Sequence, residues 1–331
     1  MNWIDAHSHI PLDIPDAAAW WAELGIDAAM NICVAHDDLG KLVEQRAWYR
    51  ALAKFEPEKW AWATSFSLEG FGSAGWVQQA ISQIRRDCEA GRGHATGCKV
   101  WKNVGMELRD PVSGAFVFVD DERFAPVFEW LQMAGRPLLM HIAEPIQAWR
   151  PLNPRDPHYA YFSNTKKWHW HGRPEVPSHE RLIASRDAII ARYPKLPVIG
   201  LHFGSQEHDL KAVGERLARW PNYHIDTAAR FGDLIVHAEH DREALIAFFD
   251  LWQDRILWGV DFAVTHPISL YSEEERAKLR AAMSYQFGLE RAFFETDQEM
   301  TILGRTVRGL NLRRDVLQKV VRGNARRMYW R

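Results

Sequence analysis

The sequence predicts one closed barrel of eight parallel strands, each followed by helical chain, a (β/α)8 architecture that uses all 331 residues. Short apolar segments recur eight times, and segments with helical spacing lie between them. Strands that alternate with helices pair in parallel through crossover connections. Eight such units in succession favour a closed barrel over an open sheet, and barrels of this type reach roughly 250 residues or more as one unit. We therefore expect residues 1–331 to form a single domain.

The predicted elements follow one another along the chain. The strand candidates are Trp3–Ile10, Ala28–Val34, Trp60–Ser67, Gly97–Trp101, Pro137–Ile142, Val198–Phe203, Tyr223–Thr227 and Ile256–Phe262. The main helical segments are Leu39–Lys54, Trp76–Ala90, Phe124–Ala134, His179–Arg192, Asp209–Arg219 and Arg242–Trp252.

Local start and stop signals support these helices. Pro177-Ser178 supplies a helix start before His179, and Tyr193-Pro194 supplies a stop. A last helical region, Leu312–Tyr329, contains Gly323-Asn324, which predicts a stop followed by a new helix start.

One connection is much longer than the others. From about residue 143 to 177 the chain is rich in Pro, Trp, His and Arg and has no clean periodicity. Long loops in compact domains often carry function. Because this one follows the fifth predicted strand, we expect it to be an insertion over the carboxyl ends of the strands, where barrels of this type place their sites.

Composition excludes several classes of protein. The formal net charge is −2, with no long basic run, which argues against nucleic acid or an anionic membrane as the main partner. The three cysteines form no CxxC pair, which suits a reducing compartment. The chain shows neither a signal-peptide pattern nor ~20 consecutive apolar residues. We expect a soluble cytoplasmic protein whose partner is a small molecule, and the sequence leaves a homo-oligomer open.

Two histidines lie close together in the first predicted strand. His7 and His9 are two residues apart, so their side chains point to the same face, ~7 Å apart along the strand. Two imidazoles on one face can chelate zinc, manganese or iron. The alternative is a hydrogen-bonded pair that closes the barrel end.

Other strands end on the same residue types. His141 closes the fifth predicted strand, His202 the sixth and Asp261 the eighth. In a barrel these groups and the histidine pair meet at one mouth. Burying them together without a metal would leave polar groups hard to satisfy. The pattern therefore predicts a metal site.

With these motifs the chain resembles the amidohydrolase superfamily, and within it the amidohydrolase-related (type 2) group. The resemblance runs from Asp5-Ala6-His7-Ser8-His9 to Gly323-Asn324-Ala325. It implies a divalent metal, for which we expect zinc, with manganese or iron as alternatives, and one ion rather than two. The metal ligands it implies are His7, His9, His141 and Asp261.

The resemblance leaves two further side chains with open roles. It makes His202 either a ligand of a second metal or an acid–base residue. Lys99, in the fourth predicted strand, resembles the carboxylated lysine that bridges two metals in binuclear members, and Lys102 is the less favoured bridge. The alternatives for Lys99 are an ion pair inside the barrel or a contact to the substrate.

The resemblance favours a hydrolase that acts on an amide, a lactone or a related carbonyl compound. A metal would lower the pKa of a bound water, Asp261 would take its proton, and His202 would orient the substrate or protonate the leaving group. The enzymatic alternative is a non-oxidative decarboxylase of a small aromatic or unsaturated acid, because the same residues serve both reactions. A third interpretation is a metal-binding barrel without catalysis.

Candidate substrate contacts follow the strands, where arginines suit a carboxylate and tryptophans suit a flat ring. For each of them a solvated loop residue is the alternative, and the Trp168-His169-Trp170-His171 run could instead pack the loop or contact another subunit. Asp5 shares a face with His7, as a partner of that histidine or as a buried structural group. The candidates are Trp101, Lys102, Arg109, Glu144, Arg150, Arg155, His158, Trp168, His169, His171, Arg230, Thr265 and His266.

Overall fold

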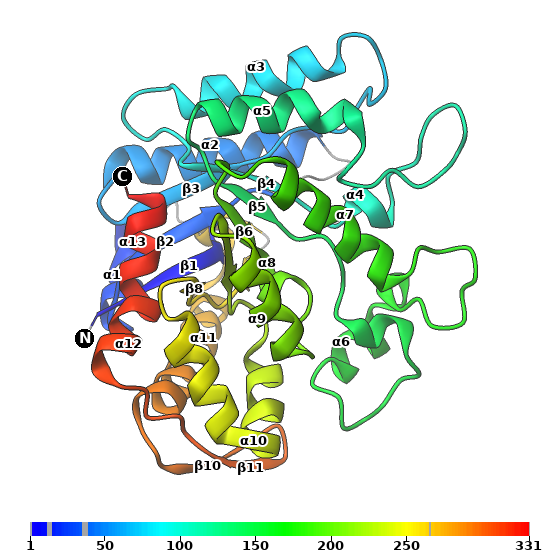
Figure 1. Ribbon diagram of the computed structural model, residues 1–331. Coiled ribbons are helices and arrows are strands. Elements are labelled where there is room, and N and C mark those ends of the chain that lie inside the picture. The colour runs from blue at the N-terminus through cyan, green and yellow to red at the C-terminus, as the bar shows by residue number, and fades with distance from the viewer. Residues whose placement is uncertain (1, 12–14, 35–38, 265, 331) are drawn as a thin grey trace.

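The computed structural model describes residues 2–11, 15–34, 39–264 and 266–330. One parallel sheet runs through the molecule, with helices outside it (Figure 1). Its strands hydrogen-bond in the order β8-β7-β6-β5-β4-β3-β2-β1-β9. Their bounds are β1 Trp3–His9, β2 Ile26–Ile32, β3 Trp60–Thr64, β4 Gly97–Val100, β5 Leu138–Met140, β6 Val198–Gly200, β7 Tyr223–Asp226, β8 Ile256–Leu257 and β9 Phe262–Ala263.

The sheet closes into a barrel because its two outermost strands belong to one interrupted segment of chain. β8 pairs with β7, and β9, five residues further on, pairs with β1. Between them the backbone N–H of Ala6 donates to Trp258 O at 3.0 Å, and the N–H of Asp261 donates to His7 O at 2.8 Å. A Cβ at Gly259 would lie only 2.9 Å from the backbone nitrogen of His7, so glycine allows this close approach. The predicted (β/α)8 barrel is confirmed.

Helices flank the strands, and some of them were not predicted. The long helix α11 and the β10–β11 hairpin carry the chain from β9 to the C-terminal helices. The helices are α1 Pro15–Glu23, α2 Leu39–Phe55, α3 Trp76–Cys88, α4 Asn103–Met106, α5 Ala125–Met133, α6 Tyr159–Asn164, α7 His179–Arg192, α8 Leu201–Gly204, α9 Leu210–Arg219, α10 Phe231–Trp252, α11 Glu273–Glu295, α12 Arg314–Gln318 and α13 Asn324–Tyr329. The hairpin strands are β10 Glu299–Ile302 and β11 Arg305–Arg308.

Several predicted boundaries were wrong. The sixth strand ends at Gly200, because α8 begins at Leu201 and residues 202–205 turn with left-handed backbone angles. Gly323 does not stop the last helix: its φ of −60° is helical, and a π-helical turn over Lys319–Gly323 joins α12 to α13. The start of α7 is as predicted, with the Ser178 side chain accepting from the N–H of Arg181.

The barrel interior is apolar, and one end of it is plugged. Inward-facing side chains such as Ile4, Leu139 and Leu257 form one buried cluster, which α13 joins through Met328 and Tyr329. The amide of Asn324 donates to Ile256 O at 2.6 Å, at the start of β8, so α13 packs against the amino-terminal ends of the strands. The carboxyl-terminal ends therefore remain for a site. Among the described residues, no helix is long and apolar enough to cross a membrane.

Candidate active site

A cavity of about 910 Å³ opens at the carboxyl-terminal ends of the strands. Two groups of side chains lie around it, and most members of each group line the cavity. The first, here called the histidine floor, consists of His7, His9, His141, His202 and Asp261. The second, here called the ion-paired wall, consists of the pairs Lys102–Glu144, Arg230–Glu207 and His158–Asp233.

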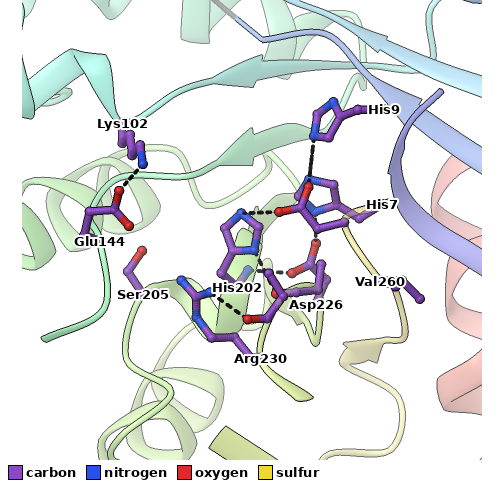
Figure 2. A network of polar contacts seen from close by, with 12 residues as sticks. His7, His9, Lys102, Glu144, His202, Ser205, Asp226, Arg230 and Val260 are labelled. Carbon is purple, nitrogen blue, oxygen red and sulfur yellow. Dashed lines mark hydrogen bonds and ion pairs between the residues drawn. The ribbon is translucent and has the colours of Figure 1, made fainter. Parts of the chain in front are cut away.

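The histidine floor converges on one carboxylate. Asp261 Oδ1 lies 3.1 Å from His9 Nε2 and 3.4 Å from His7 Nε2, and the two Nε2 atoms are 3.2 Å apart. His202 Nε2 lies 4.0 Å from Asp261 Oδ2. Ligand atoms of His7, His202 and Asp261 all lie within 4.8 Å of one another, a spacing that could hold a metal ion. Figure 2 shows His7, His9 and His202 turned toward each other.

Hydrogen bonds behind the floor fix the tautomers of two imidazoles. His7 Nδ1 lies 2.7 Å from Asp226 Oδ2, and His202 Nδ1 lies 2.8 Å from the carbonyl oxygen of Ala228. Both acceptors require an N–H at Nδ1, so in the neutral rings each Nε2 presents a lone pair to Asp261. Lone pairs and a carboxylate that face each other without a proton between them suit a divalent cation.

His141 completes the floor with an orphaned atom. Its ring lies edge-on to His202 at a centroid distance of 4.3 Å. Its Nε2 is buried and has no hydrogen-bond partner among the described residues, and the same holds for His9 Nδ1. An unpartnered buried imidazole nitrogen is costly unless a ligand occupies it. The donor set therefore fits a metal ion.

Burial keeps these imidazoles neutral. It lowers the pKa of His202 to about 3 and holds the pKa values of His7 and His141 well below the ordinary value. For Asp261 burial alone would raise the pKa, but the facing His7 and the hydrogen bond to His9 hold it well below its ordinary value. Neutral imidazoles beside an ionised carboxylate are the forms that ligate metals.

Two floor residues occupy left-handed backbone. His202 has a φ of 58° and Asp261 a φ of 64°, conformations that non-glycine residues rarely adopt. The His202 turn is tied down: its N–H donates to Asp226 Oδ1 at 2.5 Å, and Ser205 Oγ donates to Ala143 O at 2.8 Å. Asp226 therefore holds both the His7 ring and the His202 backbone.

Lys99 lies inside the barrel at the edge of the cavity. Its side chain is buried, and burial lowers its pKa to about 8 against the opposing effects of Asp261 and Asp226. Asp5 has the structural role of the two we considered: its Oδ1 accepts the backbone N–H groups of His7 and Val260, both at 3.1 Å. It joins β1 to the chain after β8.

The ion-paired wall comes from loops after the strands. Tyr161 OH donates to Glu144 Oε1 at 2.8 Å, and the Lys102 ammonium contacts the same oxygen. Beside them, Arg230 Nε lies 3.2 Å from Glu207 Oε2. The third pair joins His158 Nε2 to Asp233 Oδ2 at 2.9 Å.

Only some of the predicted substrate contacts line the cavity. Those that line it are Trp101, Lys102, Glu144, His158, Arg230 and His266. The other described candidates do not border it: Arg109, Arg150, Arg155, Trp168, His169 and His171. Thr265 lies outside the described residues.

The excluded candidates have other contacts. Arg109 lies over the Phe116 ring at 3.2 Å, within a local bridge. His169 Nε2 bonds to the carbonyl oxygen of Arg150 at 2.9 Å, within the long loop. Trp168 packs behind the wall, 5.8 Å from the Trp101 ring. These side chains shape the loop rather than the cavity surface.

Sequence reasoning missed several residues of the site. Asp226 ends β7 as Asp261 follows β8, so its position at a strand end was a usable signal. Glu207 and Asp233 carry no such signal, because they lie after α8 and in the first turn of α10. Tyr161 lies in α6, inside the loop without periodicity.

Most of the chain matches a known protein family. The family model described as Amidohydrolase (Amidohydro_2) matches residues 68–331. The fold and the site thus define a barrel of the amidohydrolase class, and the chain belongs to this family. No curated protein matches the chain.

Solved structures share the barrel at low identity. The 5-carboxyvanillate decarboxylase of Sphingomonas paucimobilis is 14% identical, with a TM-score of 0.57 over 99% of each chain. The 2,6-dihydroxybenzoate decarboxylase of Rhizobium is 16% identical, with a TM-score of 0.55 over 99% of this chain and 98% of that one. The 4-oxalomesaconate hydratase of Rhodopseudomonas palustris is 12% identical, with a TM-score of 0.52 over 99% and 95%. At these identities the likeness shows the fold.

Proposed function

We propose that this protein is a metal-dependent, non-oxidative decarboxylase, a carbon–carbon lyase, of a small aromatic or unsaturated acid. The observation that carries the proposal is Arg230, a buried guanidinium on the wall of the cavity whose floor is the histidine cluster. Its Nε faces Glu207 and its Nη1 donates to the carbonyl oxygen of Ala229, while Nη2 has no hydrogen bond to the described residues. A buried guanidinium edge of this kind suits a carboxylate.

Four floor residues would hold the metal. We assign His7, His9 and Asp261 because their ligand atoms are the closest together, and His141 because its Nε2 has no other partner. We expect one ion, with zinc ahead of manganese and iron. When bound, a divalent cation supplies positive charge that holds and polarises the substrate oxygens.

The reaction needs a proton at carbon. An acid R–COO⁻ releases CO2 when the electron pair of its C–C bond stays on carbon, and one proton then completes R–H. His202 Nε2 would take that proton from solvent that reaches the cavity and pass it to carbon, because its Nδ1–H is committed to Ala228 O. Asp261 Oδ2, 4.0 Å from that nitrogen, would stabilise the protonated ring.

The hydrolase that the motifs led us to expect uses the same residues, and the comparisons support it less well. Two of the three similar structures are named as decarboxylases of carboxylated phenols, and the third as a hydratase. Those names support a lyase for this chain. Lys99, although its pKa is lowered to about 8, makes no ion pair with the described residues, and we give it no bridging role.

The test is a turnover screen of metal-loaded protein. Hydroxybenzoic and related unsaturated acids are followed for CO2 release and for the decarboxylated product, in parallel with amides and lactones followed for hydrolysis. We expect CO2 release that is lost in His202→Asn, with metal content kept in that variant. Hydrolysis without CO2 release would contradict the decarboxylase and support the hydrolase. If the metal-loaded protein turned over neither class of compound, the result would support a metal-binding barrel without catalysis.

A further inference from the structure

A polar triad of Lys102, Glu144 and Tyr161 forms one part of the ion-paired wall. Lys102 follows β4, whereas Glu144 and Tyr161 belong to the long loop after β5. Both members of the Lys102–Glu144 pair are more than nine-tenths buried, and all three side chains line the cavity. Figure 2 shows the Lys102–Glu144 pair set apart from the histidines.

The charge of Lys102 is used up inside the protein. Its ammonium donates to Glu144 Oε1 and to Tyr161 OH, the latter at 3.2 Å. The third direction is filled by the Trp168 ring, whose centroid lies 4.1 Å from Nζ. An ammonium has three donors, and two hydrogen bonds and a cation–π contact occupy them. Lys102 therefore has no donor left for a substrate carboxylate, although a lysine that lines a cavity would ordinarily be expected to bind one.

The hydrogen bonds of this triad leave one acceptor atom without a partner at the cavity. Tyr161 OH is donor to Glu144 and acceptor from Lys102, so its hydrogen-bonding capacity is largely used. Glu144 Oε1 accepts from both partners. Glu144 Oε2 makes no hydrogen bond with the described residues, although the side chain borders the cavity. What the triad offers a ligand is thus a carboxylate oxygen, which is a hydrogen-bond acceptor.

We propose that Glu144 reads a hydrogen-bond donor on the substrate, a hydroxyl or amino group carried by the ring away from the reacting carboxylate. This inference rests on the proposed decarboxylase and narrows its substrates to hydroxylated or aminated aromatic monoacids. A second carboxylate at this position would face Glu144 with like charge and would be rejected. A methyl ether would leave the buried Oε2 without a donor.

The experiment uses full-length, metal-loaded protein and a matched set of ligands. The set consists of 2-hydroxybenzoic acids whose distal substituent is hydroxyl, amino, methoxy or carboxylate. Binding is measured by calorimetry and turnover by CO2 release. For the wild-type protein we expect the benzoic acids with a distal hydroxyl or amino substituent to bind more tightly than the methoxy-substituted acid, by roughly ten- to a hundredfold in affinity. The distal diacid should bind weakest.

A double variant removes both charges of the Lys102–Glu144 pair, so that neither charge is left buried without its partner. Lys102→Met with Glu144→Met replaces the buried pair by apolar side chains of similar size, an exchange that proteins often tolerate. We expect its preference for the donor-bearing acids to fall to near unity while its metal content stays unchanged. Lys211→Met with Glu215→Met removes an exposed Lys–Glu pair on α9 and is the matched control. Urea unfolding of both variants checks that they are folded.

The outcomes separate the two proposals. Selective binding of the hydroxyl acid without CO2 release would keep the Glu144 subsite and reject the decarboxylase. Turnover with equal preference for hydroxyl and methoxy acids would keep the decarboxylase and reject the subsite. Preference of the wild-type protein for the distal diacid would also reject it, because Lys102 would then be reading an anion.

Discussion

The two borders of the cavity handle buried charge in opposite ways. In the ion-paired wall each carboxylate faces a cation or an imidazole: Glu144 with Lys102, Glu207 with Arg230, and Asp233 with His158. Three other buried carboxyls make no ion pair with a lysine or arginine of the described chain: Asp226, which faces the His7 imidazole, Asp5, and Glu290 on α11.

The pKa values record the difference. Burial raises the pKa of Asp226 to about 6 and that of Glu290 to about 7, and it raises that of Asp5 well above its ordinary value. Burial without a cationic partner thus disfavours the charged form of these three carboxyls. The wall is balanced by its own side chains. We therefore expect a metal ion at the floor, whereas in the wall Arg230 leaves a guanidinium edge for a carboxylate and Glu144 leaves an oxygen for a hydrogen-bond donor.

The largest effect should come from the floor. We expect about one metal ion per chain, and we expect the His7→Ala, His9→Ala double variant to hold almost none and to lose at least about a thousandfold in activity. Elemental analysis of protein purified without chelator measures the first quantity. The wall variant Lys102→Met, Glu144→Met is the counterpart and should keep its ion. Loss of metal from both variants, or from neither, would abolish the contrast between the two borders.

A smaller effect is expected from Asp226→Asn. The new amide can still accept from the His202 N–H through oxygen, so its NH2 group must face His7 Nδ1. That forces the His7 proton onto Nε2, toward His9 and Asp261. We expect metal affinity to fall roughly ten- to a hundredfold, as measured by competition with a chelator.

The control for this variant is Asp5→Asn. Its oxygen can still accept the two backbone N–H groups that Asp5 binds, and no tautomer depends on it. Metal affinity should therefore stay near the wild-type value. Equal affinities of Asp226→Asn and the wild type would show that Asp226 does not orient His7.

The smallest effect concerns stability and Glu290. Its carboxylate accepts from Trp258 Nε1 at 2.7 Å and from Gln286 Nε2 at 2.6 Å. Because its pKa is about 7 in the fold and ordinarily 4.5, the folded chain binds this proton more tightly than the unfolded chain does. The resulting stabilisation is complete below about pH 4.5 and is lost as the pH rises through 7.

Glu290→Gln should remove this dependence. The Gln286 amide can flip to donate or accept, so the neutral side chain keeps its partners. The wild-type free energy of unfolding should fall relative to the variant by up to about 3 kcal/mol between pH 5 and pH 8. Urea unfolding at the two pH values measures it, with the exposed Glu215→Gln as control. If the free energies of unfolding of the wild type and the variant changed with pH in parallel, Glu290 would not be the group whose pKa is raised in the fold.

Much of the histidine floor could be predicted from the sequence because each member is tied to a strand end. His7 and His9 share a face of β1 by the two-residue period, and His141 follows β5 directly. Where local backbone departs from the strand, prediction was weaker. The run from Val198 to Phe203 does not show that His202 begins a left-handed turn, because hydrogen bonds to Asp226 and Ala143, both far away in the chain, hold that turn.

The ion-paired wall could not be predicted in the same way. Lys102 and Glu144 are separated by 42 residues and Arg230 and Glu207 by 23, and each is a polar residue in a loop, where the default expectation is solvation. Whether the charge of Lys102 faces a substrate or a glutamate is set by how the long loop folds back. No period in the sequence encodes that contact.

By itself the sequence determined the barrel, the family resemblance and the strand-end residues of the floor, because alternation and short spacings act through local geometry and recur at fixed intervals. Tertiary structure alone decided that β8 and β9 close the barrel, that Asp226 orients two histidines, and that Lys102 is consumed by Glu144, Tyr161 and Trp168. These features arise from contacts between segments far apart in the chain. Their free energies depend on burial and on neighbouring charges, which exist only once the chain has folded.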